Sequence, residues 1–144
     1  GVIYAPALDQ LYYGDVQNGS FKLNNAAAYF GQDAAQKLPL IKEKPYYGIV
    51  ASRSHLSTET SQYIDEIKAE HSAVRIISKG SSLKLCMIAE GEADVYPRFS
   101  PTSEWDIAAG HAIVNGANGK IVLASNLNKE LKYNKENILN EIII

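Results

Sequence analysis

Several features that mark particular classes of protein are scarce or missing in this chain of 144 residues. It contains one cysteine, and a lone thiol cannot form an internal disulfide, which favours a reducing compartment. No apolar run approaches the length of a membrane span. The formal net charge is −2, so no broad basic surface for nucleic acid is expected. A compact domain with a hydrophobic core is the class that remains, because the chain is long enough to form one.

The single cysteine, Cys86, lies in the apolar run Leu85–Ala89. A reactive thiolate needs a cationic and partly exposed setting, which these neighbours do not supply. We therefore predict that Cys86 belongs to the core and is not a nucleophile.

Strand and helix signals alternate along the chain, which predicts a layered α/β fold with a mixed sheet. The expected strands cover residues 2–5, 10–13, 20–23, 46–52, 74–78, 93–99 and 120–124, and the expected helices cover 57–70, 82–90 and 103–115. Residues 24–44 are expected to form a surface excursion with one short helix. We divide the chain into residues 1–45, the end of an N-terminal sheet with this excursion, and a C-terminal α/β domain over 46–144.

The segment Ser100–Val114 carries the most informative carboxylate of the sequence. Ser103 is the natural N-cap of the expected helix, which places Asp106 in the first turn, and the small residues 108–110 leave space beside it. A helix start favours anions, and a carboxylate there can hold a hard cation that in turn binds a phosphate. Ser103 and Asp106 also have the spacing of a capping box, so closing the helix is the alternative role.

A second candidate site lies at Lys79–Ser82, where a strand ends and a helix begins. Gly80 permits a sharp turn, and the hydroxyls of Ser81 and Ser82 lie beside free helix N–H groups, a combination that suits a phosphate. An ordinary turn with a serine cap is the alternative. The presence of Lys84 favours the phosphate site over the ordinary turn. A cation in the first helical turn opposes the helix dipole, and an anionic ligand would offset that cost.

Two further candidates follow expected strands. The planar guanidinium of Arg98 suits bidentate contact with a phosphate, although an exposed arginine at a strand end is the alternative. His55 lies at the C-terminal end of a strand, where open α/β sheets usually bind ligands. His71, at a helix end, and His111, inside the helix that follows Ser103, are not assigned to chemistry.

Four stretches of the sequence are specific in combination: Gly1–Pro6 with Leu11–Tyr13, Ser52–His55, Gly80–Lys84 through Ala93–Phe99, and Trp105–Gly110. The last reads Trp-Asp-x-Ala-Ala-Gly, and the set resembles the Mg²⁺-dependent, lithium-sensitive inositol monophosphatase superfamily. Within it, the set is similar to the CysQ-like 3′(2′),5′-bisphosphate nucleotidases. Inositol-specific members tend to carry an acidic residue where this chain has Arg98.

This resemblance implies an enzyme that removes the 3′-phosphate of 3′-phosphoadenosine 5′-phosphate, giving AMP and phosphate, in sulfur assimilation. It implies Mg²⁺ as cofactor and a cytoplasmic location, which can be peripheral to the inner membrane. Asp106 is implied as a metal ligand. The adenosine bisphosphate is expected to contact His55, Ser81, Lys84 and Arg98, beside Gly80 and Ser82 of the phosphate-binding turn.

The family's Asp-Pro-(Ile/Leu)-Asp-Gly-Thr motif and Glu-Glu pair do not occur in this sequence. The chain therefore resembles the C-terminal half of the enzyme, and we expect it to be inactive without the other half as its partner. A non-catalytic nucleotide- or phosphate-binding module, an inositol-phosphate phosphatase and a ligand-free interaction domain stay open. For the last, an exposed sheet edge at Val2–Ala5 or Ile142–Ile144 is expected to pair with a second copy; neither nucleic acid nor a membrane is indicated as a partner.

Overall fold

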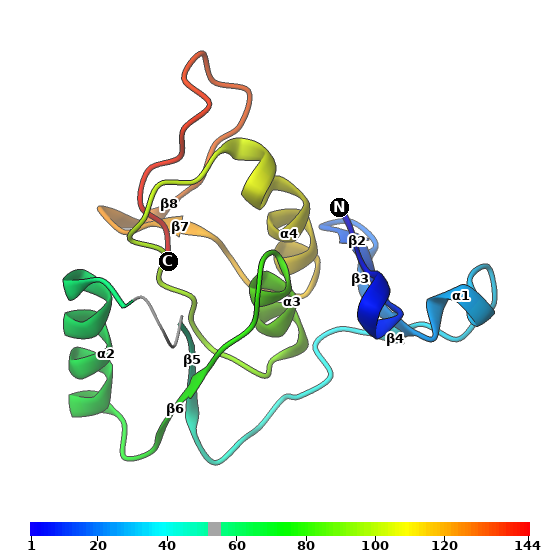
Figure 1. Ribbon diagram of the computed structural model, residues 1–144, viewed down its shortest axis with the longest axis horizontal. Coiled ribbons are helices and arrows are strands. Elements are labelled where there is room, and N and C mark those ends of the chain that lie inside the picture. The colour runs from blue at the N-terminus through cyan, green and yellow to red at the C-terminus, as the bar shows by residue number, and fades with distance from the viewer. Residues whose placement is uncertain (52–55) are drawn as a thin grey trace.

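Helices and strands form layers in this protein (Figure 1). The computed structural model describes residues 1–51 and 56–144, and within them three small β-sheets are present. The helices α3 (Leu83–Glu90) and α4 (Glu104–Gly116) lie between the N-terminal sheet on one side and the remaining strands on the other. This arrangement confirms the predicted layered α/β class. None of the described helices is long and apolar enough to cross a membrane.

The N-terminal sheet is antiparallel, with the strand order β1–β2–β3–β4. Its strands are β1 (Val2–Ala5), β2 (Gln10–Asp15), β3 (Gly19–Asn24) and β4 (Gln36–Lys37), with a 3-10 turn at Pro6–Leu8 between the first two. Gly19 has a φ of 84°, which suits the tight turn between β2 and β3. The first three strands were predicted, because their alternation and turn residues are local signals.

The expected surface excursion over residues 24–44 is only partly correct. The short helix is present as α1 (Ala26–Tyr29). However, β4 extends the sheet, and Leu38 is 3 % exposed within the hydrophobic core. The N–H of Leu38 donates to the carbonyl of Ser20 at 2.8 Å, so the chain returns to the sheet here. The residues around Leu38 show no strand alternation, so the sequence did not reveal this anchor.

The strands β5 (Tyr47–Val50) and β6 (Val74–Ile77) form a parallel pair, connected through α2 (Thr58–Glu70). The hydroxyl of Ser57 accepts the N–H of Thr60 at 3.2 Å, which confirms the predicted N-cap of α2. Ile64 is 2 % exposed and packs in a core cluster with the β5 side chains. The predicted amphipathic helix therefore covers this sheet.

The two central helices pack closely because small residues lie on α4. A Cβ on Gly110 would lie 2.3 Å from the side chain of Leu85 on α3. On the other face, the hydroxyl of Ser20 in β3 donates to the carbonyl of Ile113 at 2.7 Å. Cys86 on α3 is 1 % exposed, which confirms its prediction as a core residue.

The strand predicted over residues 93–99 is wrong. Only isolated bridges form there: Ile49–Val95 and Arg98–Ile143. Pro97 has no N–H to donate to a ladder. In addition, the side-chain Oδ2 of Asp94, not a backbone carbonyl, accepts the N–H of Gly48 at 2.6 Å. The segment nevertheless connects β5 to the C-terminal residues.

The predicted strand over 120–124 is shorter in the structure. It contains β7 (Val122–Leu123), which pairs across a bulge with β8 (Asn126–Glu130). The predicted open edge at Ile142–Ile144 is wrong, because Ile143 is 1 % exposed and bridges both Arg98 and Leu123. In the described part of the chain, β1 is an edge strand of its sheet, with Val2 65 % exposed.

Candidate functional site

The starts of α3 and α4 and the segment around Arg98 enclose one pocket of about 200 Å³, which we call the candidate pocket. The predicted residues that line it are Ser81, Ser82, Lys84, Arg98 and Asp106, and the others are Leu85, Tyr96, Pro101, Thr102 and Ile107. The tertiary structure thus brings together side chains from three segments that the sequence marked separately.

The turn before α3 differs from the prediction in one detail. The left-handed residue is Ser81, with a φ of 51°, and not Gly80. This conformation is uncommon for a residue with a Cβ. A Cβ on Gly80 would meet no atom within 4 Å, and Gly80 does not line the candidate pocket. Among the described residues, the hydroxyls of Ser81 and Ser82 form no hydrogen bond, so both are available to a ligand.

Two cations share the candidate pocket. The Nζ of Lys84 lies 5.5 Å from the centre of the Tyr96 ring. Burial, and then the charge of nearby Arg98, lower the pKa of Lys84. The Nε of Arg98 is buried without a hydrogen-bond partner in the described structure. Neither side chain forms an ion pair with a carboxylate of residues 1–51 or 56–144, and an anionic ligand would relieve this imbalance.

Asp106 is exposed at the start of α4, on another wall of the candidate pocket. Its Oδ2 accepts the N–H of Ser103 at 2.7 Å, so the capping role is present. Its Oδ1 accepts no hydrogen bond from the described residues. These residues also contain no group of three or more His, Cys, Asp or Glu side chains that could hold a metal ion. Asp106 therefore fits as one ligand of Mg²⁺ but does not complete a site, since this ion requires several oxygens in octahedral order.

None of the histidines in the described residues lies in the candidate pocket. The predicted ligand contact His55 lies outside the described residues. His71 occupies the C-cap position of α2, as predicted, and its ring stacks on Tyr47 at 4.1 Å. His111 is 5 % exposed, its Nδ1 lies 2.7 Å from the Tyr133 hydroxyl oxygen, and burial lowers its pKa. Neither His71 nor His111 lines the candidate pocket.

Tyr96 and Thr102 line the candidate pocket but were missed from the sequence. Tyr96 lies two positions before Arg98, so the alternation of an extended chain places both on one side and was a usable signal. Thr102 had no such signal. Its side chain is held by a hydrogen bond from Asn140, which lies far along the chain.

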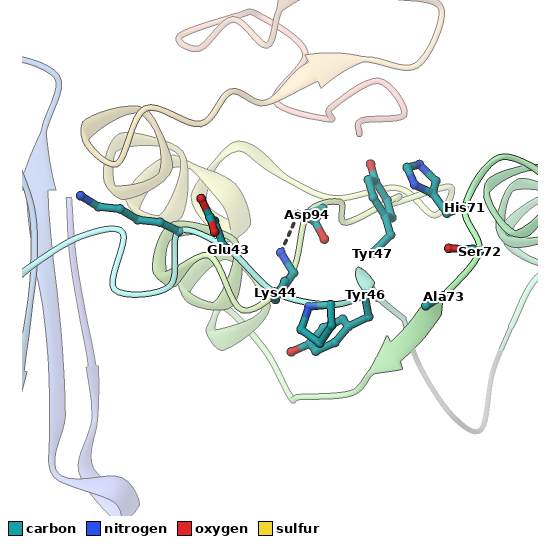
Figure 2. Close-up of a pocket in the computed structure, with 10 residues that line it drawn as sticks. Glu43, Lys44, Tyr46, Tyr47, His71, Ser72, Ala73 and Asp94 are labelled. Atoms are coloured by element: carbon teal, nitrogen blue, oxygen red, sulfur yellow. Dashed lines mark hydrogen bonds and ion pairs between the residues drawn. The ribbon is translucent and has the colours of Figure 1, made fainter.

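A larger hollow of about 570 Å³ lies at the N-terminal ends of β5 and β6 and contains none of the predicted site residues (Figure 2). We call it the β5–β6 hollow. The Nζ of Lys44 pairs there with Asp94 Oδ1 at 2.5 Å, and Tyr47 lies against His71. Parallel α/β sheets usually bind ligands at the opposite, carboxyl ends of their strands. The candidate pocket is therefore the stronger site.

The chain belongs to the inositol monophosphatase family, which it matches over residues 1–141. Curated relatives include the 3′(2′),5′-bisphosphate nucleotidase CysQ of Buchnera aphidicola, 43% identical over 122 residues, and that of Salmonella typhimurium, 38% identical over 121. Each alignment covers 84% of this chain, but only 41% and 44% of those proteins. The chain thus spans less than half the length of these curated relatives.

A solved structure extends the match to the fold. The crystal structure of CysQ from Bacteroides thetaiotaomicron, a bacterial member of the inositol monophosphatase family, has a TM-score of 0.89 with this chain and 40% sequence identity. The superposition covers 99% of this chain and 55% of that one. The predicted family and fold type are therefore confirmed.

Proposed function

We propose that this chain forms the C-terminal part of a Mg²⁺-dependent phosphatase that removes the 3′-phosphate of 3′-phosphoadenosine 5′-phosphate. The observation that carries this proposal is that two cations without carboxylate partners among the described residues, Lys84 and Arg98, share one pocket with Asp106. The name of the CysQ relatives, 3′(2′),5′-bisphosphate nucleotidase, supports the substrate class. A cytoplasmic location stays a prediction.

The cationic wall is proposed to bind phosphate. The guanidinium of Arg98 offers paired donors in one plane, and Lys84 adds a compact charge. Hydroxyls of the Ser81–Ser82 turn add neutral donors beside the free amides of the α3 N-terminus. His55 is a further proposed contact, which rests on the family resemblance alone.

The carboxylate wall is proposed to bind Mg²⁺ through Oδ1 of Asp106. Because Oδ2 is bound to the N–H of Ser103, the orientation of the carboxylate is already fixed. When bound, Mg²⁺ supplies positive charge for the reacting phosphate and lowers the pKa of a water molecule. A single carboxylate does not satisfy this ion, so the remaining ligands are proposed to lie outside these 144 residues.

The size of the candidate pocket supports the same division of the site. Its volume of about 200 Å³ is below the roughly 300–1,000 Å³ of typical small-molecule sites. A bisphosphate nucleotide therefore needs a further wall. We accordingly propose that the 144-residue chain alone hydrolyses no substrate at a useful rate.

The test is a chimera in which this chain replaces the matching 55% of the Bacteroides thetaiotaomicron CysQ. Phosphate release is measured with Mg²⁺ from 3′-phosphoadenosine 5′-phosphate and from inositol 1-phosphate. We expect turnover of the nucleotide by the chimera and none by the chain alone. Asp106→Asn should lower turnover by at least about 100-fold, since changes outside the metal ligands already cost 10–100-fold.

Two results would contradict the proposal. Preference of the chimera for inositol 1-phosphate would favour the inositol-phosphate phosphatase. Rapid hydrolysis by the isolated chain, abolished by Asp106→Asn, would show that no further ligands are needed.

A further inference from the structure

The start of α4 is held by a C-terminal segment that is distant in sequence, residues 131–140, which we call the tail. Figure 1 shows this orange-red segment beside the first turn of α4. The N–H of Asn140 donates to the carbonyl of Thr102 at 2.8 Å, and the N–H of Glu104 donates to the carbonyl of Ile138 at 3.0 Å. The tail thus pairs with the backbone that leads into the helix.

The side chain of Asn140 adds a buried contact. Asn140 is 7 % exposed, and its Nδ2 donates both to Thr102 Oγ1 at 3.1 Å and to the carbonyl of Ser103 at 3.0 Å. Thr102 lines the candidate pocket, and the N–H of Ser103 binds Asp106. One amide therefore contacts both residues on which the carboxylate wall depends.

An ion pair between the tail and Glu104 also holds this turn. The Nζ of Lys135 donates to Glu104 Oε1 at 2.6 Å, and the N–H of Asn134 donates to Glu104 Oε2 at 2.8 Å. Hydrogen bonding by Lys135 lowers the pKa of Glu104. The same Nζ donates to the carbonyl of Lys132 at 2.8 Å. Glu104 is the first residue of α4, two positions before Asp106.

Apolar packing holds this turn at Ile107, which is 3 % exposed and packs in the hydrophobic core, but not at the two residues before it. Trp105 is 69 % exposed, and Asp106 beside it is also exposed. The hydrogen bonds from the tail therefore add a constraint on the residues that precede Ile107, including the Ser103 amide. If that amide moves, Oδ2 of Asp106 loses its donor and the carboxylate is free to rotate.

We propose that Asn140, Lys135 and Glu104 are positioning residues that orient Thr102 and Asp106 within the candidate pocket. None of the three lines the candidate pocket, so each acts through a neighbour. The assignment of this order to ligand binding rests on the proposed function.

Two readouts test this proposal in the chimera with the Bacteroides thetaiotaomicron CysQ, which supplies the further wall that the nucleotide needs. Mg²⁺ is left out so that the nucleotide is not hydrolysed. Amide hydrogen exchange at Ser103 reports the local order, and an NMR titration with 3′-phosphoadenosine 5′-phosphate reports the dissociation constant. The variants are Asn140→Ala and Lys135→Met, with Lys135→Arg as the conservative rescue. The matched control is Lys44→Met, which breaks an ion pair of 2.5 Å in the β5–β6 hollow, against 2.6 Å for Lys135.

We expect Asn140→Ala and Lys135→Met to accelerate exchange at Ser103 by about tenfold, the loss expected for a hydrogen bond worth about 1.4 kcal/mol. Exchange at Cys86 in α3 should stay within about twofold. The nucleotide dissociation constant should rise about three- to tenfold in these two variants. It should return toward the original value in Lys135→Arg and remain unchanged in Lys44→Met.

The outcomes separate this inference from the proposed function. Equal acceleration at Ser103 and Cys86, or the same effects from Lys44→Met, would show a merely structural role and overturn the inference. Unchanged affinity in Asn140→Ala and Lys135→Met, with binding by the parent chimera, would also overturn it. Absence of binding by the parent chimera would contradict nucleotide recognition, while the exchange at Ser103 would still decide whether the tail orders this turn.

Discussion

The candidate pocket and the β5–β6 hollow contain similar side chains but use their charges differently. In the hollow, Oδ1 of Asp94 pairs with Lys44 (Figure 2). Its Oδ2 accepts the N–H of Gly48. In the pocket, Lys84 and Arg98 form no ion pair with the described carboxylates. The comparison indicates that the Lys44–Asp94 pair of the hollow stabilises the fold, whereas the two cations of the pocket are available to a ligand.

The largest expected effect is on nucleotide affinity. Arg98→Ala in the chimera should weaken binding of 3′-phosphoadenosine 5′-phosphate roughly 10–100-fold, because hydrogen bonds to a charged group are worth about 1.5–3 kcal/mol. Titration calorimetry measures the change. Lys44→Ala should leave the dissociation constant within about twofold, and equal losses from both variants would remove the distinction between the two regions.

The second effect is on stability. Asp94→Ala should lower the free energy of unfolding by about 2 kcal/mol, because it leaves the buried Gly48 N–H and the Lys44 ammonium without their partner. Urea denaturation measures it. Asp65→Ala is the matched control, since its ion pair with Lys68 is exposed, and its cost should be about 0.5 kcal/mol. Similar costs for the two variants would argue against a structural role for the hollow.

The turn of the candidate pocket provides a smaller test. Ser81→Val should destabilise the chain by about 1 kcal/mol, because a β-branched residue fits poorly at a φ of 51°. Gly80→Ala should change stability by less than about 0.5 kcal/mol, since the added Cβ meets no atom within 4 Å. Thermal denaturation compares the two, and the opposite order would place the constraint at Gly80.

The smallest expected effect is a gain in stability, not a loss. Lys84→Met should stabilise the chain without ligand by about 0.5 kcal/mol, because it removes a cation that opposes the α3 dipole. Lys44→Met, in contrast, should destabilise it by breaking a pair. Urea titrations of both variants provide the measurement, and a stability loss in Lys84→Met would mean that this cation is satisfied within the fold.

Much of the fold and of the candidate site was predictable from local patterns, and the errors have either a local cause or a contact with a distant segment. The helix starts at Ser57 and Ser103 were predicted because capping residues act within one turn. The strand over 93–99 failed because Asp94 and Pro97 interrupt a ladder that apolar alternation alone suggests. The anchor at Leu38 and the buried position of Ile143 were missed, since both depend on partners far along the chain.

The amino-acid sequence by itself determined the longer helices, most of the strands, the core role of Cys86 and the residue types suited to phosphate and magnesium. These properties follow from periodicity, capping and side-chain chemistry within a few residues. Only the tertiary structure decided that Lys84, Arg98 and Asp106 share one pocket, that Ser81 takes the left-handed conformation, and that Asn140 reaches Thr102. The reason is physical: contacts between distant segments depend on how the layers pack, which no local pattern encodes.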